Sequence, residues 1–195
     1  MEQVVLLDDT GAPIGVTEKA LVHNTDTPLH LAFSCYGFAA DGRMLLTRRS
    51  LAKRTWPGVW TNACCGHPAP GEDPELAVRR RVGSELGVEP HDVRLVLPDF
   101  RYRAVAADGI VEHEVCPVYF ADLPTTLAPD PGEVLEWAWV APSSFLDVAA
   151  QAPFLLSPWS VLQAEEFRRR GLLAAPGLAE LTRHPTSLLD LSPRS

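Results

Sequence analysis

The sequence predicts an α+β or mixed-sheet sandwich. Apolar runs of strand length occur along most of the chain, and two other stretches carry clear helix signals at both ends. These strands and helices do not alternate regularly, so a purely parallel βαβ sheet is disfavoured. With 195 residues and 46% hydrophobic content, the chain has the size and composition of one globular domain.

The strands are predicted from apolar runs that end in turn residues. Asp8-Asp9-Thr10-Gly11 closes the first run, and Asp41-Gly42 is a hairpin signal between two others. Residues 19–30 are polar, so we expect His23 and His30 on loop or irregular structure. The predicted strands are residues 4–7, 31–38, 43–47, 93–97, 114–120 and 133–140.

Two helices are predicted from their capping residues. The first spans residues 74–86, because Asp73 is a good N-cap and Gly87 suits the position after the last turn. The second starts at Ser157-Pro158 and stops at Gly171. The apolar residues of the first helix recur every four positions and form its buried stripe, at Val78, Val82 and Leu86.

Charge and composition limit the partners and the compartment. The net charge of −8 argues against general nucleic-acid binding. No apolar run approaches the ~20 residues that span a bilayer, and the N-terminus lacks the basic segment of a secretory signal. The four cysteines have no even spacing, so we expect reduced thiols in the cytoplasm. We expect one domain over residues 1–171 and a weakly structured extension over 172–195.

The segment Trp56–Pro68 holds the densest group of chemically active residues. It places the thiol of Cys65 two residues before the imidazole of His67, on a turn rich in Gly and Pro. Directly before it, residues 43–54 contain five Lys or Arg residues and no acid. A solvated surface would also explain the basic residues, but their position favours an anion site.

Residues 66–88 fit a degenerate Nudix box. The matching positions are Gly66, Glu72, Arg80, Glu85, Gly87 and Val88. An intact box presents several glutamates to Mg²⁺, whereas this chain has Arg81 and Ser84 at two of those positions. The remaining carboxylate, Glu85, can hold one Mg²⁺ that bridges to phosphate oxygens, but it does not easily build a multi-metal hydrolytic centre. The altered box therefore argues against a hydrolase.

The run Glu112-His113-Glu114 indicates a second metal site. On a strand, Glu112 and Glu114 share one face, where two carboxylates repel each other unless a cation or a proton intervenes. The candidates that complete the site are His23, His30 and His67. Imidazoles and carboxylates together suit Mn²⁺ or Zn²⁺ better than Mg²⁺. Taken singly, each histidine more commonly has a structural role in a core or at a surface.

Five sequence blocks together resemble the type 1 isopentenyl diphosphate isomerases. They occur in the family's order with compatible spacing, at residues 29–34, 56–68, 99–103, 112–118 and 157–159. The resemblance implies an α/β fold, a Nudix-type mixed β-sheet sandwich flanked by helices, with an N-terminal elaboration that supplies two histidines. It also implies interconversion of isopentenyl diphosphate and dimethylallyl diphosphate. We expect a monomer or weak homodimer with no nucleic-acid or membrane partner.

The resemblance also implies roles for individual residues. Cys65 and Glu114 are the opposed acid and base, with Tyr102 beside Glu114 and Trp159 facing a carbocation. A Mn²⁺ or Zn²⁺ ion is implied at His23, His30, His67, Glu112 and Glu114. A Mg²⁺ ion is implied between the substrate diphosphate, Glu85 and the backbone carbonyl of Cys65. The implied diphosphate contacts are Lys19, Arg49, Lys53 and Arg81, whereas Cys35, Cys64 and Cys116 are expected to be packing residues.

Two other functions stay open. A Nudix pyrophosphohydrolase is disfavoured by Arg81 and Ser84, and release of phosphate would reveal it. A non-enzymatic Nudix-like binding module would explain an anion pocket, but it has no need for Cys65, Glu114 and Trp159 together.

Overall fold

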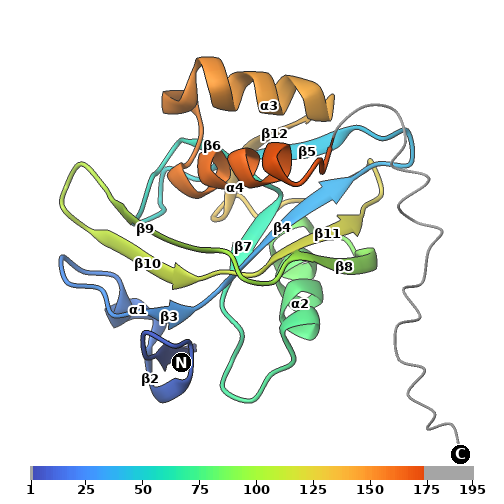
Figure 1. The fold of residues 1–195 in the computed structure, drawn as a ribbon. Helices are drawn as coiled ribbons and strands as arrows, with labels where there is room; N and C mark the ends of the chain where they lie inside the picture. Colours follow the sequence, from blue (N-terminus) through green and yellow to red (C-terminus); the bar gives the residue numbers. More distant parts are fainter. Residues whose placement is uncertain (1, 174–195) are drawn as a thin grey trace, which may run out of the picture.

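Two β-sheets form the framework of the computed structural model, which describes residues 2–173 (Figure 1). The smaller sheet has five strands in the order β2-β1-β3-β10-β9. Its strands are β1 (Gln3–Leu7), β2 (Pro13–Glu18), β3 (His30–Leu31), β9 (Arg101–Val105) and β10 (Val111–Val115).

The larger sheet has seven strands, five of them in the order β12-β5-β4-β11-β8. Two short strands lie off this path, since β6 pairs with β5 and β7 pairs with β4. The strands of this sheet are β4 (Phe33–Phe38), β5 (Met44–Arg49), β6 (Trp60–Thr61), β7 (Cys64–Gly66), β8 (His91–Leu97), β11 (Val118–Asp122) and β12 (Val134–Val140).

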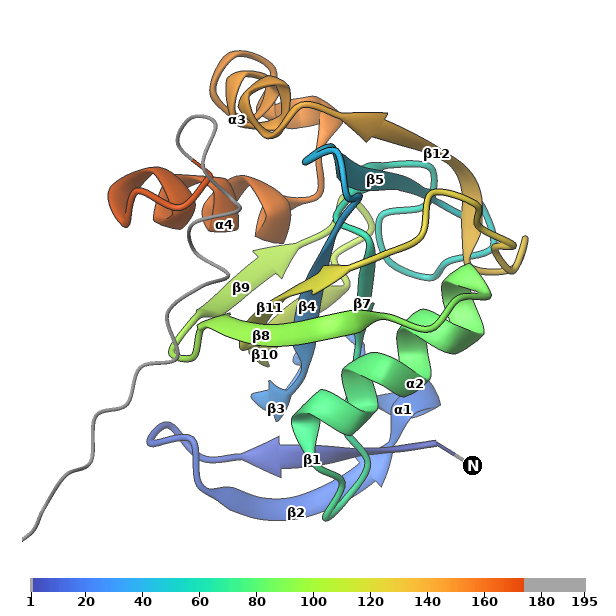
Figure 2. The same ribbon diagram turned by 90° about the vertical axis from the view of Figure 1, so that its right-hand side faces the viewer.

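Helices cover both faces of the larger sheet. Helix α2 lies on one face, and α3 and α4 lie together on the other (Figure 2). The β1–β2 hairpin lies at the opposite end of the molecule from α3, beside the N-terminus (Figures 1 and 2). The helices are α1 (Lys19–Val22), α2 (Pro74–Leu86), α3 (Pro142–Gln151) and α4 (Pro158–Arg169), with a 3₁₀ turn at Pro153–Leu155.

Strand β4 is buried on both faces because helices cover it from both sides. Phe33 and Cys35 belong to the core cluster that contains the apolar stripe of α2. Tyr36 and Phe38 point the other way, into the cluster formed with α3 and α4. The strand is therefore a rigid support for its neighbour β7.

The chain passes from the smaller sheet to the larger one twice, and these two crossings lie side by side. Strands β3 and β10 pair in parallel in the small sheet, and β4 and β11 pair in parallel in the large one. The Ala32 N–H donates to the Val115 carbonyl at 2.9 Å, and the Ser34 N–H donates to the Pro117 carbonyl at 3.0 Å. This pairing places His30 directly beside Glu114, close to where the two sheets meet.

The structure corrects two predicted strands and one predicted loop. The strand predicted at 114–120 is wrong: Cys116-Pro117 separates β10 from β11, because a proline has no N–H to continue the ladder. The strand predicted at 31–38 is likewise divided at Ala32. The loop predicted at 19–30 is confirmed at His23, which follows the one-turn helix α1 in irregular structure, but it is wrong at His30, which begins β3.

The segment around Cys65 differs from the predicted turn. Residues 64–66 form strand β7, because Cys64 and Cys65 pair with Cys35 and Ser34 of β4. Strands β2 and β9 and helix α3 have no counterpart among the predicted elements. The strands predicted at 4–7, 43–47, 93–97 and 133–140 are confirmed, with ends that differ by a few residues.

The helix predicted at 74–86 is confirmed with both of its caps. The Asp73 carboxylate accepts the N–H of Glu75 at 2.8 Å and of Leu76 at 3.4 Å. At the other end Gly87 has a φ of 67°, and a Cβ there would lie 2.4 Å from the Ala128 carbonyl oxygen. The predicted stripe of Val78, Val82 and Leu86 is fully buried.

The second predicted helix is also confirmed, with Ser157 as its N-cap. Beyond it, Leu172 and Leu173 pack against the core, and the rest of the extension predicted at 172–195 lies outside the described residues. Within residues 2–173, every helix is too short or too polar to cross a membrane.

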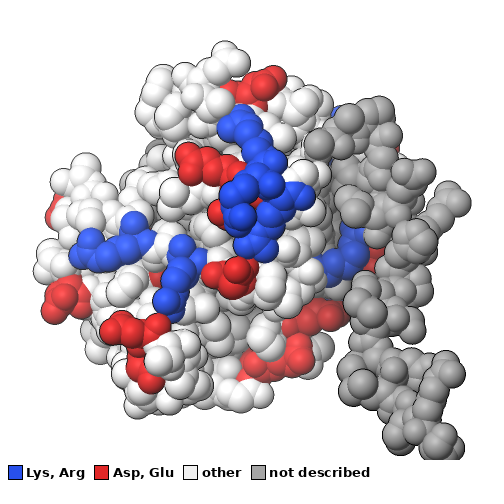
Figure 3. Space-filling model, viewed as in Figure 1, with Lys and Arg blue, Asp and Glu red and all other residues white. Residues whose placement is uncertain are grey.

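On the face seen in Figure 3, Lys and Arg side chains form groups that are flanked by acidic side chains.

Candidate active site and metal centre

A cavity of about 470 Å³ lies where the two sheets meet, and it gathers most of the predicted site residues. The four predicted diphosphate contacts line it, and so do the four predicted catalytic residues. The catalytic set is Cys65, Tyr102, Glu114 and Trp159, and the diphosphate set is Lys19, Arg49, Lys53 and Arg81. Thiol, phenol, carboxylate and indole groups thus share the cavity with these four cations, which we call the basic wall.

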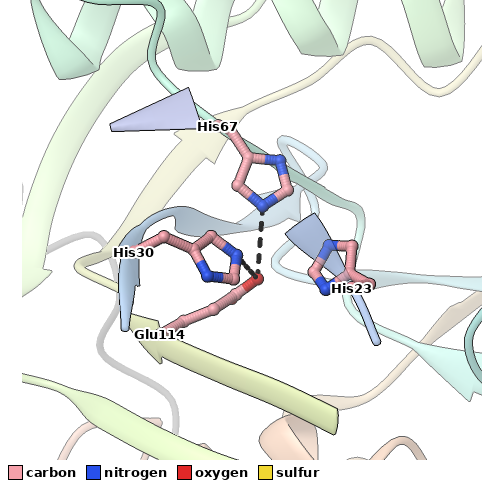
Figure 4. Close-up of side chains that lie close together, drawn as sticks. All are labelled: His23, His30, His67 and Glu114. Atoms are coloured by element: carbon pink, nitrogen blue, oxygen red, sulfur yellow. Dashed lines mark hydrogen bonds and ion pairs between the residues drawn. The ribbon is translucent and has the colours of Figure 1, made fainter. Parts of the chain in front are cut away.

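Three histidines and one glutamate converge beside this cavity (Figure 4). One potential ligand atom from each of His23, His30, His67 and Glu114 lies within 4.8 Å of the others. The Glu114 Oε1 atom lies 3.3 Å from His67 Nε2 and 3.4 Å from His30 Nε2. Four of the five predicted ligands are thus close enough to share one ion.

The hydrogen bonds of these histidines fit a metal centre. The His30 Nδ1 atom donates to the Pro28 carbonyl at 2.9 Å, which leaves Nε2 as the nitrogen that faces Glu114 and would bind an ion. Without an ion, burial lowers the pKa of His30, but the contact with Glu114 outweighs it and raises that pKa. Within residues 2–173, the His23 Nδ1, His30 Nε2 and His67 Nδ1 atoms are buried without a hydrogen-bond partner, whereas His67 faces Glu114 with Nε2 (Figure 4). Burial lowers the pKa of both His23 and His67, which favours the neutral imidazoles that bind metals.

Glu112, the fifth predicted ligand, is held by hydroxyl groups. Its Oε1 atom accepts a hydrogen bond from Thr55 at 2.6 Å, and its Oε2 atom lies 3.0 Å from the Tyr102 hydroxyl. The same hydroxyl lies 3.0 Å from Glu114 Oε2. As predicted, Glu112 and Glu114 share one face of β10, and Tyr102 joins them from the paired position on β9.

The two carboxyl groups differ in their acidity. Burial raises the pKa of Glu112, and the neighbouring charge of Glu114 raises it further. Burial also opposes the ionisation of Glu114, but hydrogen bonds to His30 and His67 outweigh it and hold its pKa well below the usual range. Without a bound ion, Glu114 is therefore the stronger acid of the pair and is ionised at neutral pH.

Strand alternation separates the two adjacent thiols. Cys64 points into the core beneath α2, whereas Cys65 packs against the opposite cluster and reaches the cavity. Burial raises the pKa of Cys65 to about 12, so its thiol is neutral and carries a proton. Its Sγ atom lies 3.2 Å from Asn62 Oδ1 and 3.4 Å from Ser34 Oγ.

Trp159 lies in the first turn of α4 and is 2% exposed. Its indole N–H is 3.0 Å from both Thr61 Oγ1 and Asn62 Oδ1. The ring of Trp56 meets it edge-on at 5.6 Å between centroids, and Tyr102 lies at 6.0 Å. The Arg49 guanidinium carbon is 5.2 Å from the ring centroid, within the range of a cation–π contact.

The basic wall is held in place by carbonyls and acids. Arg49 donates to the carbonyls of Thr55 and Trp56. Arg81 pairs with Glu85, the predicted Mg²⁺ ligand, and its Nη2 lies 3.4 Å from Glu133. Lys53 pairs with Glu133 as well. The mixed charges keep these cations folded over the cavity rather than extended into solvent.

Glu85 lines a second, smaller cavity of about 20 Å³ next to the first. This cavity shares Arg49, Lys53 and Cys65 with the larger one. Gly66 permits the close packing here, because a Cβ at this position would lie 2.8 Å from Arg81 Cγ. The predicted Mg²⁺ ligands are thus adjacent to the predicted diphosphate contacts.

Several residues of the site have no counterpart in the sequence prediction. They are Ser34, Thr55, Asn62, Glu133 and Gln163. Each is polar, and all but Glu133 are buried at 6% exposure or less. Asn62 lies inside Trp56–Pro68, the segment that resembles the isomerases. Its position close to Cys64 and Cys65 is the one sequence feature that could have marked it as a site residue.

Comparison with known proteins agrees with this geometry. The NUDIX domain family matches residues 28–159. In solved structures the fold resembles DR0079 from Deinococcus radiodurans, with a TM-score of 0.64 at 19% identity over 86% of this chain and 98% of that one. It also resembles the MutT protein of Methanosarcina mazei Go1, with a TM-score of 0.57 at 21% identity over 74% and 96%. At these identities the likeness concerns the fold alone.

Sequence relatives are much more similar. The isopentenyl-diphosphate Delta-isomerase of Frankia alni is 58% identical over 85% of this chain and 86% of that protein. The corresponding protein of Paenarthrobacter aurescens is 54% identical over 92% and 97%, and that of Citrobacter koseri is 52% identical over 88% and 95%. The chain therefore belongs to the isopentenyl-diphosphate Delta-isomerases, a family of enzymes that carry a Nudix domain.

Proposed function

We propose that this protein interconverts isopentenyl diphosphate and dimethylallyl diphosphate by a 1,3 proton shift through a tertiary carbocation. The single observation that carries the proposal is that one cavity has Cys65 and Glu114 in its walls beside a basic wall. An allylic shift needs one group to give a proton and another to take one, and both must reach the same short carbon chain. A diphosphate provides the anchor that holds that chain in place.

The protonation states of the two groups suit a proton shift. The neutral thiol of Cys65 has a proton to give, and the ionised Glu114 can accept one. Protonation of the terminal alkene carbon leaves a cation on the tertiary carbon, and loss of a proton from the neighbouring methylene carbon forms the new double bond. In the reverse direction the same two groups exchange their roles.

The cation needs a surface that stabilises it without trapping it. The indole of Trp159 and the phenol of Tyr102 line the cavity and offer π faces, which attract a cation and form no bond with it. We propose that one face of Trp159 meets the substrate while Arg49 covers another part of the ring. The diphosphate is bound by Lys19, Lys53 and Arg81, which exchange their acidic partners for phosphate oxygens.

Two metal ions fit the residues present. We propose that His23, His30, His67, Glu112 and Glu114 hold Mn²⁺ or Zn²⁺, since ligand atoms of four of them converge and the buried Nε2 atom of His30 has no hydrogen-bond partner within the described residues. Glu85 and the Cys65 carbonyl would hold Mg²⁺ next to the diphosphate. When bound, the ions would fix the carboxylates and offset their charge.

We also propose that the protein works in a reducing compartment such as the cytoplasm, where its four cysteines stay free thiols.

Turnover of isopentenyl diphosphate tests the proposal. With Mg²⁺ present, we expect dimethylallyl diphosphate to form without release of phosphate. Glu114→Gln should abolish the reaction, whereas His113→Gln, on the other face of the same strand, should leave most of it. Phosphate release in place of isomerisation would indicate a Nudix hydrolase, and binding without turnover would indicate a binding module.

A further inference from the structure

Asn62 is a fully buried amide that the proposed reaction does not use. It lies between β6 and β7, directly behind the wall of the cavity that carries Cys65 and Trp159. Its side chain contacts both of these residues as well as two backbone carbonyls. A buried amide with a partner at every polar atom is a fixed part of its site.

The orientation of this amide is determined by its partners. The Asn62 Nδ2 group donates to the Cys35 carbonyl at 3.0 Å and to the Cys64 carbonyl at 2.7 Å, which uses both of its hydrogens. On the other side stands the indole N–H of Trp159, which can only donate. The carbonyl oxygen of Asn62 must therefore face the indole and the thiol.

One oxygen atom thus receives hydrogen bonds from both residues. Cys65 Sγ lies 3.2 Å from Asn62 Oδ1, and Trp159 Nε1 lies 3.0 Å from it. The Thr61 hydroxyl is a second acceptor for the indole at 3.0 Å, and it also contacts Asn62 Oδ1 at 2.8 Å. The thiol and the indole therefore compete for one acceptor, and the position of each depends on the other.

We propose that Asn62 is a positioning residue that aligns Cys65 and Trp159 with each other across the substrate. The inference rests on the proposed function, in which the thiol gives the proton and the indole faces the resulting cation. Both must stand at fixed places relative to the same carbon chain, and small displacements reduce rate strongly. Because the Asn62 amide is anchored to β4 and β7 through the two carbonyls, it transmits the rigidity of the large sheet to both groups.

The competition for one oxygen gives a test that leaves Asn62 intact. In protein with ¹⁵N-labelled tryptophan, the Trp159 indole N–H signal is assigned among the five tryptophans with Trp159→Phe. Cys65→Ala removes one donor from the shared oxygen, so the indole hydrogen bond should strengthen and its proton signal should move downfield. Cys65→Ser keeps a donor at the same place and should move the signal less.

Cys64→Ala is the matched control, because the Cys64 side chain points to the other face of β7 and makes no hydrogen bond with the Asn62 side chain among the described residues, while the Cys64 carbonyl that Asn62 contacts is kept. It should leave the Trp159 signal in place. No movement of the signal in Cys65→Ala, or equal movement in Cys64→Ala, would overturn the proposal. Neither result depends on turnover, so the positioning role and the proposed function can fail separately.

A pair of Asn62 variants tests the effect on rate. Asn62→Asp and Asn62→Leu both lose the Nδ2 group, but only the aspartate keeps an oxygen acceptor. We expect Asn62→Leu to lose about tenfold more kcat than Asn62→Asp, with KM for isopentenyl diphosphate changed by no more than about twofold. Thermal unfolding confirms that both fold. Equal kcat losses in two folded variants would show that Asn62 only supports the backbone and would overturn the proposal. If either variant fails to fold, the Trp159 indole N–H shift in Cys65→Ala decides whether the proposal holds.

Discussion

The hydroxyl of Thr55 gives the sharpest prediction about the carboxylate pair. It donates to Glu112 at 2.6 Å in a buried setting, and Glu112 in turn shares the Tyr102 hydroxyl with Glu114. Thr55→Val removes this donor and keeps the shape of the side chain. The carboxylate of Glu112 then has one fixed partner fewer and is free to shift relative to its neighbours.

The size of the effect follows from the kind of hydrogen bond. A hydrogen bond to a charged group contributes about 1.5–3 kcal/mol, and a neutral one about 1 kcal/mol. If that contribution fixes the geometry of the acid–base site, kcat should fall by roughly tenfold to a hundredfold. KM should change little, because Arg49 loses only its 3.3 Å contact with the Thr55 hydroxyl and keeps its hydrogen bonds to the Thr55 and Trp56 carbonyls.

Thr27→Val is a matched control for this experiment. The Thr27 hydroxyl is also buried, and it donates at 2.7 Å to the carbonyl of Val111, the residue directly before Glu112. Both variants should lower the free energy of unfolding in urea, but only Thr55→Val should lower kcat. If Thr55→Val loses stability and keeps its kcat, the hydroxyl supports the fold alone and the reasoning about Glu112 is wrong.

Three other predictions concern the thiols, the indole and the main helix. Cys65→Ala should lose nearly all turnover while Cys64→Ala loses little, because alternation on β7 sends only Cys65 to the cavity; equal losses in a steady-state assay would contradict this. Trp159→Phe should keep part of kcat, whereas Trp159→Leu should fall by roughly a further thirtyfold, the value of a desolvated cation–π contact of about 2 kcal/mol; equal rates would make the ring a packing residue. Asp73→Ala removes the N-cap of α2 and should lower the free energy of unfolding in urea by about 1 kcal/mol without changing kcat; an unchanged stability would mean that the cap contributes nothing.

The helices could be predicted from the sequence because their signals are local. Asp73 and Gly87 mark the ends of α2 through their own backbone and side-chain preferences, and the structure agrees at both. Helix α3 starts at Pro142 but has no side-chain cap and no glycine stop, so no local signal marks it. The division of the predicted strand 114–120 had a local signal in Pro117, whereas the division of 31–38 at Ala32 depends on the neighbouring crossing, which is a tertiary contact.

The site shows the same contrast between local and tertiary information. Alternation along a strand was enough to place Glu112 and Glu114 on one face, which the structure confirms. The partners of these groups come from distant parts of the chain: Thr55 is 57 residues from Glu112, and Asn62 is 97 residues from Trp159. Uncharged polar residues such as these have no spacing pattern, so only the folded arrangement identifies them.

The central claim is that this protein moves a proton along an intact isoprenoid diphosphate. Incubation of the enzyme with isopentenyl diphosphate and Mg²⁺ in D₂O, followed by ¹H and ³¹P NMR, tests it most directly. We predict that deuterium enters a methyl group of dimethylallyl diphosphate, and by reversal the methylene next to the alkene of isopentenyl diphosphate, while the diphosphate signals persist. Phosphate release, or product that forms without deuterium from the solvent, would contradict the proposed proton shift.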